Sequence, residues 1–290
     1  MKNQDIIIRD PFILLVGDTY YMYGSNSLKL WEPGEESFYC YKSRDLEEWE
    51  GPIEIFHKPE GFFADRNYWA PECISYNGSF YLITTFANAD TKKGIYILKA
   101  DHPEGPFAPY SERLTPEGWT CIDGTVFVDG ERIFLVYSHS FEDSPTGDMC
   151  CQELSADLTR SVTEPKLLFS APQASWAHPV PFAKMEFGMD GDVYFTDGPF
   201  LFQKDGRLYM TWSSWGTNGY AVGLARSESG TVSGPWIQYE KPFFPENGGH
   251  GMVFADKEGN LRFALHYPND KFHEHPMFID LKIEEMEKDQ

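Results

Sequence analysis

The sequence predicts an all-β fold, a single-domain five-bladed β-propeller, and three observations lead to this prediction. One short pattern occurs five times along the 290 residues: a leading acidic, polar or small residue, an apolar strand, a turn with Gly or Asp, and an aromatic-rich second strand. Units of strand, turn and strand at such spacings are typical of propeller blades. The aromatic content of 16% and the 20 prolines suit many short strands joined by tight turns.

The five leading positions are Asp10, Ala70, Asp123, Asp197 and His250, which follow one another after 60, 53, 74 and 53 residues. If the blades are radial, each leading residue opens the innermost strand of its blade. The three Asp side chains should then converge on one end of the central axis. We expect almost no helix and one catalytic domain over residues 1–290, with blades at approximately 9–57, 68–110, 121–169, 195–244 and 249–287.

Each blade continues past its leading hairpin into an outer pair of strands. In the first blade the acidic segment from Asp45 to Trp49 forms the turn between them. The long connection from Ser170 to Tyr194 breaks the blade rhythm, and extra length between blades usually builds a rim around a pocket. Residues 6–8 are expected to add a short stretch to the last blade, which helps to close the ring.

Composition limits the partners of the protein. The net charge of −21 at pH 7, without any Lys- or Arg-rich run, disfavours binding to nucleic acid or to an anionic membrane surface. No apolar run approaches the 18 residues of a membrane-spanning helix. The beginning of the chain lacks the pattern of a secretory leader, which favours a cytoplasmic location. The odd count of five cysteines, without metal-ligand spacing, indicates buried thiols in a reducing compartment.

The recurrent carboxylates carry the chemistry. Asp10 precedes Pro11, whereas Asp123 and Asp197 each precede Gly. One such Asp alone most often makes an Asx turn, but three at repeated positions favour a functional role. Crowded carboxylates raise one another's pKa, so one stays protonated while another is charged, as glycoside hydrolysis requires. A cation site is the other interpretation of the same convergence.

The order and spacing of the motifs resemble glycoside hydrolase family 43, whose members are five-bladed propellers. The resemblance covers the whole chain and rests on five segments: Arg9-Asp10-Pro11, Trp69-Ala70-Pro71-Glu72, Ile122-Asp123-Gly124-Thr125, Asp197-Gly198-Pro199 and Gly249-His250-Gly251. It implies that Asp10 is the general base that deprotonates the attacking water. It also implies that Asp123 tunes and orients the general acid.

Asp197 departs from the family pattern, because the resemblance implies a Glu in a Glu-Gly-Pro motif at this place. The Asp side chain is one methylene shorter, which draws the carboxyl group back by about 1.5 Å. We favour Asp197 as the acid in a reshaped pocket. The alternatives are that Glu72 or Glu186 has taken the role, or that catalysis is impaired. A literal Glu-Gly-Pro at residues 104–106 falls in the outer half of the second blade, away from the axis.

His250 opens the fifth repeat, and the resemblance implies a cation, commonly calcium, bound near it on the axis. A histidine that is hydrogen-bonded inside the channel is the alternative, since one imidazole is a poor ligand set for calcium. The chemistry itself requires no cofactor. His139 and His178 are weaker candidates for the pocket and are expected to be structural.

Aromatic side chains are the candidate sugar platform, because apolar sugar faces pack on such rings. Trp69 is the first choice, followed by Phe63 and Trp176, whereas Trp212 is expected in the core. Glu72 is a further candidate for substrate binding. Arg226 either hydrogen-bonds a substrate hydroxyl group or pairs with a neighbouring acid.

The predicted function is hydrolysis of a terminal pentose from plant-type oligosaccharides with inversion at the anomeric carbon. The range of the family favours α-L-arabinofuranose, with β-D-xylose next, and the expected location favours exo action. The partner is an oligosaccharide substrate, and the oligomeric state is open. The alternative is a catalytically weak carbohydrate-binding propeller, in which the Asp at position 197 marks lost chemistry.

Overall fold

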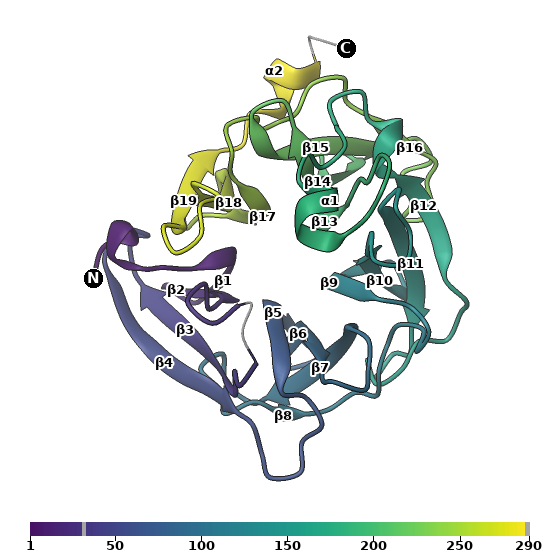
Figure 1. Ribbon diagram of the computed structural model, residues 1–290. Helices are drawn as coiled ribbons and strands as arrows, with labels where there is room; N and C mark the ends of the chain where they lie inside the picture. Colours follow the sequence, from purple (N-terminus) through teal and green to yellow (C-terminus); the bar gives the residue numbers. More distant parts are fainter. Residues whose placement is uncertain (31–32, 288–290) are drawn as a thin grey trace.

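The computed structural model describes residues 1–30 and 33–287, which form five antiparallel sheets around a central axis (Figure 1). The predicted five-bladed propeller is thereby confirmed. The first sheet contains β1 (Arg9–Val16), β2 (Thr19–Ser25), β3 (Ser37–Ser43) and β4 (Trp49–His57). The second contains β5 (Arg66–Tyr76), β6 (Ser79–Ala87), β7 (Gly94–Ala100) and β8 (Ala108–Pro109).

The other three sheets continue in chain order around the ring. The third contains β9 (Cys121–Asp129), β10 (Arg132–His139), β11 (Asp148–Leu154) and β12 (Lys166–Ser170). The fourth contains β13 (Asp197–Lys204), β14 (Arg207–Gly216), β15 (Gly219–Ser227) and β16 (Trp236–Gln238). The fifth has three strands, β17 (Gly249–Ala255), β18 (Leu261–Tyr267) and β19 (His275–Asp280).

Helical structure in the described residues is limited to four short pieces, as the sequence predicted. They are η1 (Asn3–Asp5), η2 (Ala171–Gln173), α1 (Ala183–Phe187) and α2 (Ile283–Glu287). None of the helices in the described ranges is long and apolar enough to cross a membrane. All five cysteines are buried and unpaired, which agrees with the expected buried thiols.

The innermost strand of every blade begins with a β-bulge. In the first blade Arg9 pairs with Ser25 and Phe12 pairs with Tyr23, so two residues of β1 oppose a single residue of β2. The same interruption follows Trp69, Ile122, Asp197 and Gly249. Bulges re-aim side chains at the ends of strands. Here they turn the entry of each blade toward the axis.

One residue in each bulge has a left-handed backbone, and these five residues form what we call the bulge tier. Their φ values are 56° for Asp10, 44° for Ala70, 57° for Asp123, 48° for Gly198 and 40° for His250. This conformation is unfavourable for residues other than Gly, and such strain collects at functional sites. The preceding residues form a second ring, the entry tier: Arg9, Trp69, Ile122, Asp197 and Gly249.

This register corrects the sequence alignment of the fourth repeat by one residue. Gly198, and not Asp197, occupies the position equivalent to Asp10 and Asp123. Asp197 shares its place in the blade with Arg9 and Trp69. The three acids therefore come from two neighbouring tiers rather than from three equivalent positions.

Hydrogen bonds tie the bulge tier together across the blade boundaries. At four boundaries a backbone N–H of the tier donates to a side chain on the second strand of the preceding blade, the fifth blade preceding the first. The pairs are Ala70 to Ser25 Oγ (2.7 Å), Asp123 to Thr85 Oγ1 (3.1 Å), His250 to Ser213 Oγ (3.0 Å) and Asp10 to His266 Nδ1 (3.3 Å). At the boundary between the third and fourth blades, the hydroxyl groups of Ser138 and Thr196 lie 2.7 Å apart.

The beginning of the chain contacts the last blade, as predicted for residues 6–8. The Ile8 N–H donates to the Glu274 carbonyl oxygen at 3.0 Å, and His275 Nδ1 lies 2.8 Å from the Ile6 carbonyl oxygen. The Arg9 guanidinium adds a buried ion pair with the Glu274 carboxylate at 3.0 Å. The ring is thus closed by backbone and side-chain contacts between the first and fifth blades, next to Asp10.

Candidate active site

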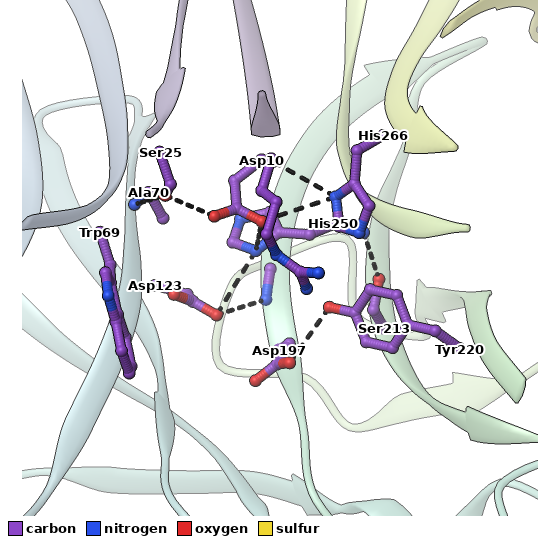
Figure 2. Close-up of polar contacts among 12 residues, drawn as sticks. Asp10, Ser25, Trp69, Ala70, Asp123, Asp197, Ser213, Tyr220, His250 and His266 are labelled. Carbon is purple, nitrogen blue, oxygen red and sulfur yellow. Dashed lines mark hydrogen bonds and ion pairs between the residues drawn. The ribbon is translucent and has the colours of Figure 1, made fainter. Parts of the chain in front are cut away.

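A cavity of about 700 Å³ opens at the axis and is lined by residues from all five blades. The three candidate acids, Asp10, Asp123 and Asp197, all line it, together with Trp69 and His250. Figure 2 shows these side chains gathered around one space. The predicted convergence of the carboxylates is therefore present.

The Asp10 carboxylate lies among donors. Ser25 donates its hydroxyl group to Oδ2 at 2.5 Å, and His250 Nδ1 lies 3.2 Å from Oδ1 (Figure 2). Burial by itself would raise the pKa of Asp10. The charges of His250 and Arg9 and the hydrogen bond from Ser25 outweigh burial, so the pKa is lowered below its ordinary value. Asp10 is consequently ionised at neutral pH and can accept a proton.

Asp123 lies between the other two acids. Its Oδ2 accepts the Gly198 N–H at 3.2 Å and lies 3.5 Å from His250 Nδ1. Burial raises the pKa of Asp123, and the negative charge of Asp10 adds to this rise, while His250 opposes it. Because Gly198 follows Asp197 directly, the contact with Asp123 also fixes the backbone that carries the third acid.

Asp197 has the opposite electrostatic character to Asp10. Burial raises the pKa of Asp197 well above its ordinary value, and the charge of Asp123 raises it further. The Tyr220 hydroxyl group donates to Oδ2 at 3.1 Å and partly offsets this rise (Figure 2). The cavity thus favours the protonated form of one carboxyl group, Asp197, and the ionised form of another, Asp10.

Tyr220 is a site residue that sequence reasoning missed. It lies near the start of β15, outside the leading hairpins in which the motifs occur. Its ring stacks with two others that lie nearly parallel to it, with centroids 5.9 Å away for Phe195 and 5.6 Å away for His266. Burial lowers the pKa of His266 well below its ordinary value, so this imidazole is neutral and its Nδ1 can accept the Asp10 N–H. Tyr220, which contacts Asp197, and His266, which contacts Asp10, are thus stacked on each other.

His250 fits a hydrogen-bonded role better than a calcium site. Its Nδ1 faces the carboxylates of Asp10 and Asp123, and its ring fills the space beside Gly198, where a Cβ would lie 2.6 Å from Cδ2. Calcium requires six to eight oxygen ligands. Across the described residues no group of three His, Cys, Asp or Glu side chains could hold a metal ion. The donor set therefore does not fit the calcium ion implied by the resemblance, which stays an untested expectation.

Trp69 lines the cavity from the second blade, as expected for a sugar platform. Its indole Nε1 donates to the Leu30 carbonyl oxygen at 2.8 Å, which fixes the ring. The Lys93 ammonium lies 4.8 Å from the ring centroid, and this ammonium also pairs with Glu142 at 2.7 Å. These contacts fix the indole ring at the cavity lining.

Three candidates for substrate binding lie elsewhere, and their assignment is corrected. Phe63 packs in an aromatic cluster outside the cavity lining, with its ring centroid 4.9 Å from that of Tyr96. Trp176 is only 5% exposed, and its ring fills the space above Gly223 in the core of the fourth blade. Arg226 lies at the far end of β15 from the cavity-lining Tyr220. The sequence around a tryptophan in a long connection, or an arginine in a strand, does not show whether the side chain lines a pocket or packs elsewhere.

Glu72 is buried outside the cavity lining, so its assignment to substrate binding is also corrected. Burial raises the pKa of Glu72 well above its ordinary value, against a hydrogen bond from Thr125, and the charge of Asp123 adds to the rise. Within the described part of the chain its Oε2 has no hydrogen-bond partner. Glu186, by contrast, lies on the exposed rim of the cavity.

The remaining candidates have structural surroundings. His139 stacks on Trp119 with ring centroids 4.1 Å apart, and His178 Nε2 lies 3.1 Å from Thr217 Oγ1. Glu104 pairs with Lys42 on the outer part of the blades, away from the acids, as expected. Trp212 is fully buried, in agreement with its predicted place in the core.

Comparison with known proteins gives a consistent family. Residues 6–284 match the model of Glycosyl hydrolases family 43. An endo-arabinase structure from Bacteroides thetaiotaomicron is 35% identical, with a TM-score of 0.87 over 97% of this chain and 96% of that one. An α-L-arabinofuranosidase structure from Lactobacillus brevis has the same fold, with 19% identity and a TM-score of 0.74 over 97% of this chain and 94% of that one.

A curated protein from Butyrivibrio fibrisolvens, a xylosidase/arabinosidase, is 28% identical over 273 residues. The alignment covers 88% of this chain but 48% of that protein, so this chain spans about half the length of the relative. The family model covers nearly the whole chain, and its match agrees with the propeller fold and the cavity acids. The chain therefore belongs to glycosyl hydrolases family 43.

Proposed function

We propose that the protein removes a terminal pentose from oligosaccharides by an inverting acid/base mechanism, with α-L-arabinofuranose the favoured sugar and β-D-xylose next. The observation that carries the proposal is the opposite pKa shift of two carboxyl groups in one cavity. The pKa of Asp10 is lowered and that of Asp197 is raised. A base and an acid are thus available together at neutral pH.

In this mechanism Asp197 donates its proton to the glycosidic oxygen as the bond from that oxygen to the anomeric carbon breaks. A water molecule attacks the anomeric carbon from the opposite face and gives its proton to Asp10. Attack opposite to the leaving group inverts the configuration. Asp123 holds the Gly198 N–H and thereby orients the neighbouring Asp197.

Asp197 is the acid we favour, in spite of the shorter side chain. Glu72 lies outside the cavity lining, and Glu186 is on the exposed rim of the cavity. The Tyr220 hydroxyl group occupies one oxygen of Asp197 and leaves the other free for the substrate. These contacts support a pocket reshaped around Asp.

The relatives support the choice of sugar. The similar proteins carry the names endo-arabinase and xylosidase/arabinosidase, and both names refer to pentose sugars. The cavity is lined by residues of all five blades. Exo action is part of the proposal, and arabino-oligosaccharides and arabinan test it.

The test compares the wild-type protein with Asp10→Ala on nitrophenyl α-L-arabinofuranoside, nitrophenyl β-D-xyloside and arabino-oligosaccharides. Asp18→Ala is the matched control, because Asp18 is an acid whose side chain is 69% exposed, in the β1–β2 turn. We expect Asp10→Ala to lose about 100- to 10,000-fold in kcat, with no change for the control. Proton NMR of the first product should show the inverted anomer.

Equal, trace turnover by the wild type and Asp10→Ala would favour the carbohydrate-binding alternative, for which the Asp at position 197 is the supporting observation. Release of internal fragments from arabinan before any arabinose would contradict exo action. Retention of configuration would contradict the roles of Asp10 and Asp197 while leaving the family assignment intact.

A further inference from the structure

The connection between β12 and β13 contains α1, which lies near the central axis (Figure 1), and Phe187 of α1 lines the cavity. Five aromatic side chains on this side line the cavity, and we call them the aromatic wall: Phe141, Phe182, Phe187, Phe195 and Trp215. Neighbouring rings are in contact, with centroids 5.0 Å apart for Phe182 and Trp215 and 4.9 Å apart for Phe141 and Phe187. The wall is continuous with the space that holds the three acids.

The wall stands on a fixed support. The Val180 N–H donates to the Val193 carbonyl oxygen at 2.8 Å, and the two buried valine side chains pack against the aromatic rings. The left-handed Gly188 ends α1 directly after Phe187. The support makes the wall a surface that is present before any ligand arrives.

The outer part of the wall is unusually open to solvent for apolar side chains. Phe187 is 47% exposed, and the adjacent Met185 on α1 is 81% exposed. An apolar patch that is left open beside a cavity marks a binding surface more often than a packing defect. Glu186, which lies between these two residues, also lines the cavity and places a carboxylate at the edge of the patch.

The wall lies on the side of the cavity from which the acid comes. Phe195 precedes Asp197 by two residues, and Trp215 lies on β14 two residues beyond Ser213, the strand partner of Asp197. The base Asp10 enters from the first blade. Because the general acid protonates the oxygen that joins the two sugars, whatever lies beyond that oxygen is the leaving group.

We propose that the aromatic wall is the binding subsite for the sugar unit released as the leaving group. The ligand class is a neutral pentose or hexose unit of an oligosaccharide, whose C–H faces pack on the rings while its hydroxyl groups reach Glu186. This inference rests on the proposed function, since it assigns the two sides of the cavity by the roles of the acid and the base.

The experiment uses two substrates that share the cleaved pentose and differ in the leaving group: an arabino- or xylo-disaccharide and the corresponding pentosyl fluoride. Fluoride has no sugar face to pack on the wall. The variants are Phe187→Ala and Phe182→Ala, and Leu167→Ala serves as control because Leu167 is 55% exposed on β12, outside the cavity. Thermal unfolding of each variant verifies the fold, and the exposed Phe187 keeps the test valid if Phe182→Ala fails to fold.

We expect kcat/KM for the disaccharide to fall about tenfold in Phe187→Ala or Phe182→Ala, which corresponds to the loss of one aromatic contact. The value for the fluoride should stay within about twofold, and Leu167→Ala should match the wild type on both. An equal fall on both substrates, or no fall on either, would overturn the inference.

Failure of the proposed function has a different signature, because the wild type would then hydrolyse neither substrate. In that event the wall is judged by disaccharide binding, measured by calorimetry. Weaker binding to Phe187→Ala than to the wild type supports the subsite, and equal binding overturns it.

Discussion

The Tyr220 hydroxyl group lies 3.1 Å from Oδ2 of Asp197, and both side chains line the central cavity. The contact joins β15 to the beginning of β13 within one blade. Since the tyrosine hydroxyl donates, it favours the charged form of Asp197 and moderates the rise in pKa that burial causes. The proposed acid is therefore oriented by this contact, and its pKa is raised less than it would be without the hydrogen bond.

Tyr220→Phe should move the alkaline limb of the pH–rate profile to higher pH. The substitution removes a hydrogen bond that lowers the pKa of Asp197, and the general acid must be protonated to act. We expect kcat on a poorly activated oligosaccharide to fall about tenfold, since the carboxyl group also loses its orientation. A limb that stays in place, with only KM altered, would show that Tyr220 acts on binding instead.

Asp197→Glu should lower the activity, although it restores the residue that the family pattern implies. The extra methylene moves the carboxyl group by about 1.5 Å and separates it from the tyrosine hydroxyl. Displacements of this size cost about 100-fold in rate. Steady-state kinetics on an aryl pentoside and on an oligosaccharide measure the effect. Activity above wild type would mean that the pocket is not adapted to the shorter side chain.

Gly198→Ala should disturb the site through His250. A Cβ at this position would lie 2.6 Å from the imidazole Cδ2, and the backbone has a φ of 48°. Gly17→Ala is the matched control, because its φ of 61° carries the same backbone strain and nothing lies within 4 Å of the added Cβ. Both variants should lose about 1 kcal/mol from strain.

Only Gly198→Ala should also lose activity, because the displaced imidazole no longer faces Asp10 and Asp123. Chemical unfolding measures the stability of the two variants, and initial rates measure their activity. If both kept full activity, the position of His250 would have no bearing on catalysis.

Glu72→Gln should stabilise the protein at alkaline pH. The pKa of Glu72 is raised in the folded state, so its stabilising effect is complete below the pKa of the unfolded chain and is lost as the pH rises through the folded value. A neutral amide of the same shape removes this dependence. We expect the difference in Tm between variant and wild type to grow from pH 4 to pH 9, by about 2–4 °C for each kcal/mol.

The opposite trend, or a difference that does not vary with pH, would contradict the buried neutral state of Glu72. Glu104→Gln provides the comparison, since Glu104 is a partly exposed surface acid paired with Lys42. Its Tm difference should not grow toward alkaline pH.

The five-bladed architecture could be predicted because a similar pattern of strand, turn and strand recurs at the beginning of each blade. Asp123-Gly124 and Asp197-Gly198 nevertheless look alike in sequence and sit differently in the fold. The bulge falls on the Asp in one case and on the Gly in the other. Strand register decides between them, and register depends on pairing along the whole hairpin, which the local motif does not contain.

The site surroundings were harder to predict for a different reason. Trp176 lies in the connection before the fourth blade, and Trp215 lies on β14 within that blade. Trp176 fills the core above Gly223, whereas Trp215 lines the cavity. Hydrophobicity is the same in both cases, and only tertiary packing separates them. Tyr220 likewise depends on three-dimensional contacts with Asp197 and His266 that leave no sequence pattern.

The hydrogen bond from the Asp10 N–H to His266 has a consequence for how the protein becomes active. Asp10 belongs to the first blade to be synthesised, and His266 to the last. A nascent or truncated chain has the proposed base without the His266 ring that accepts its backbone N–H. We therefore expect a chain that ends before β18 to lack hydrolytic activity, so that catalytic output would report complete synthesis of the propeller.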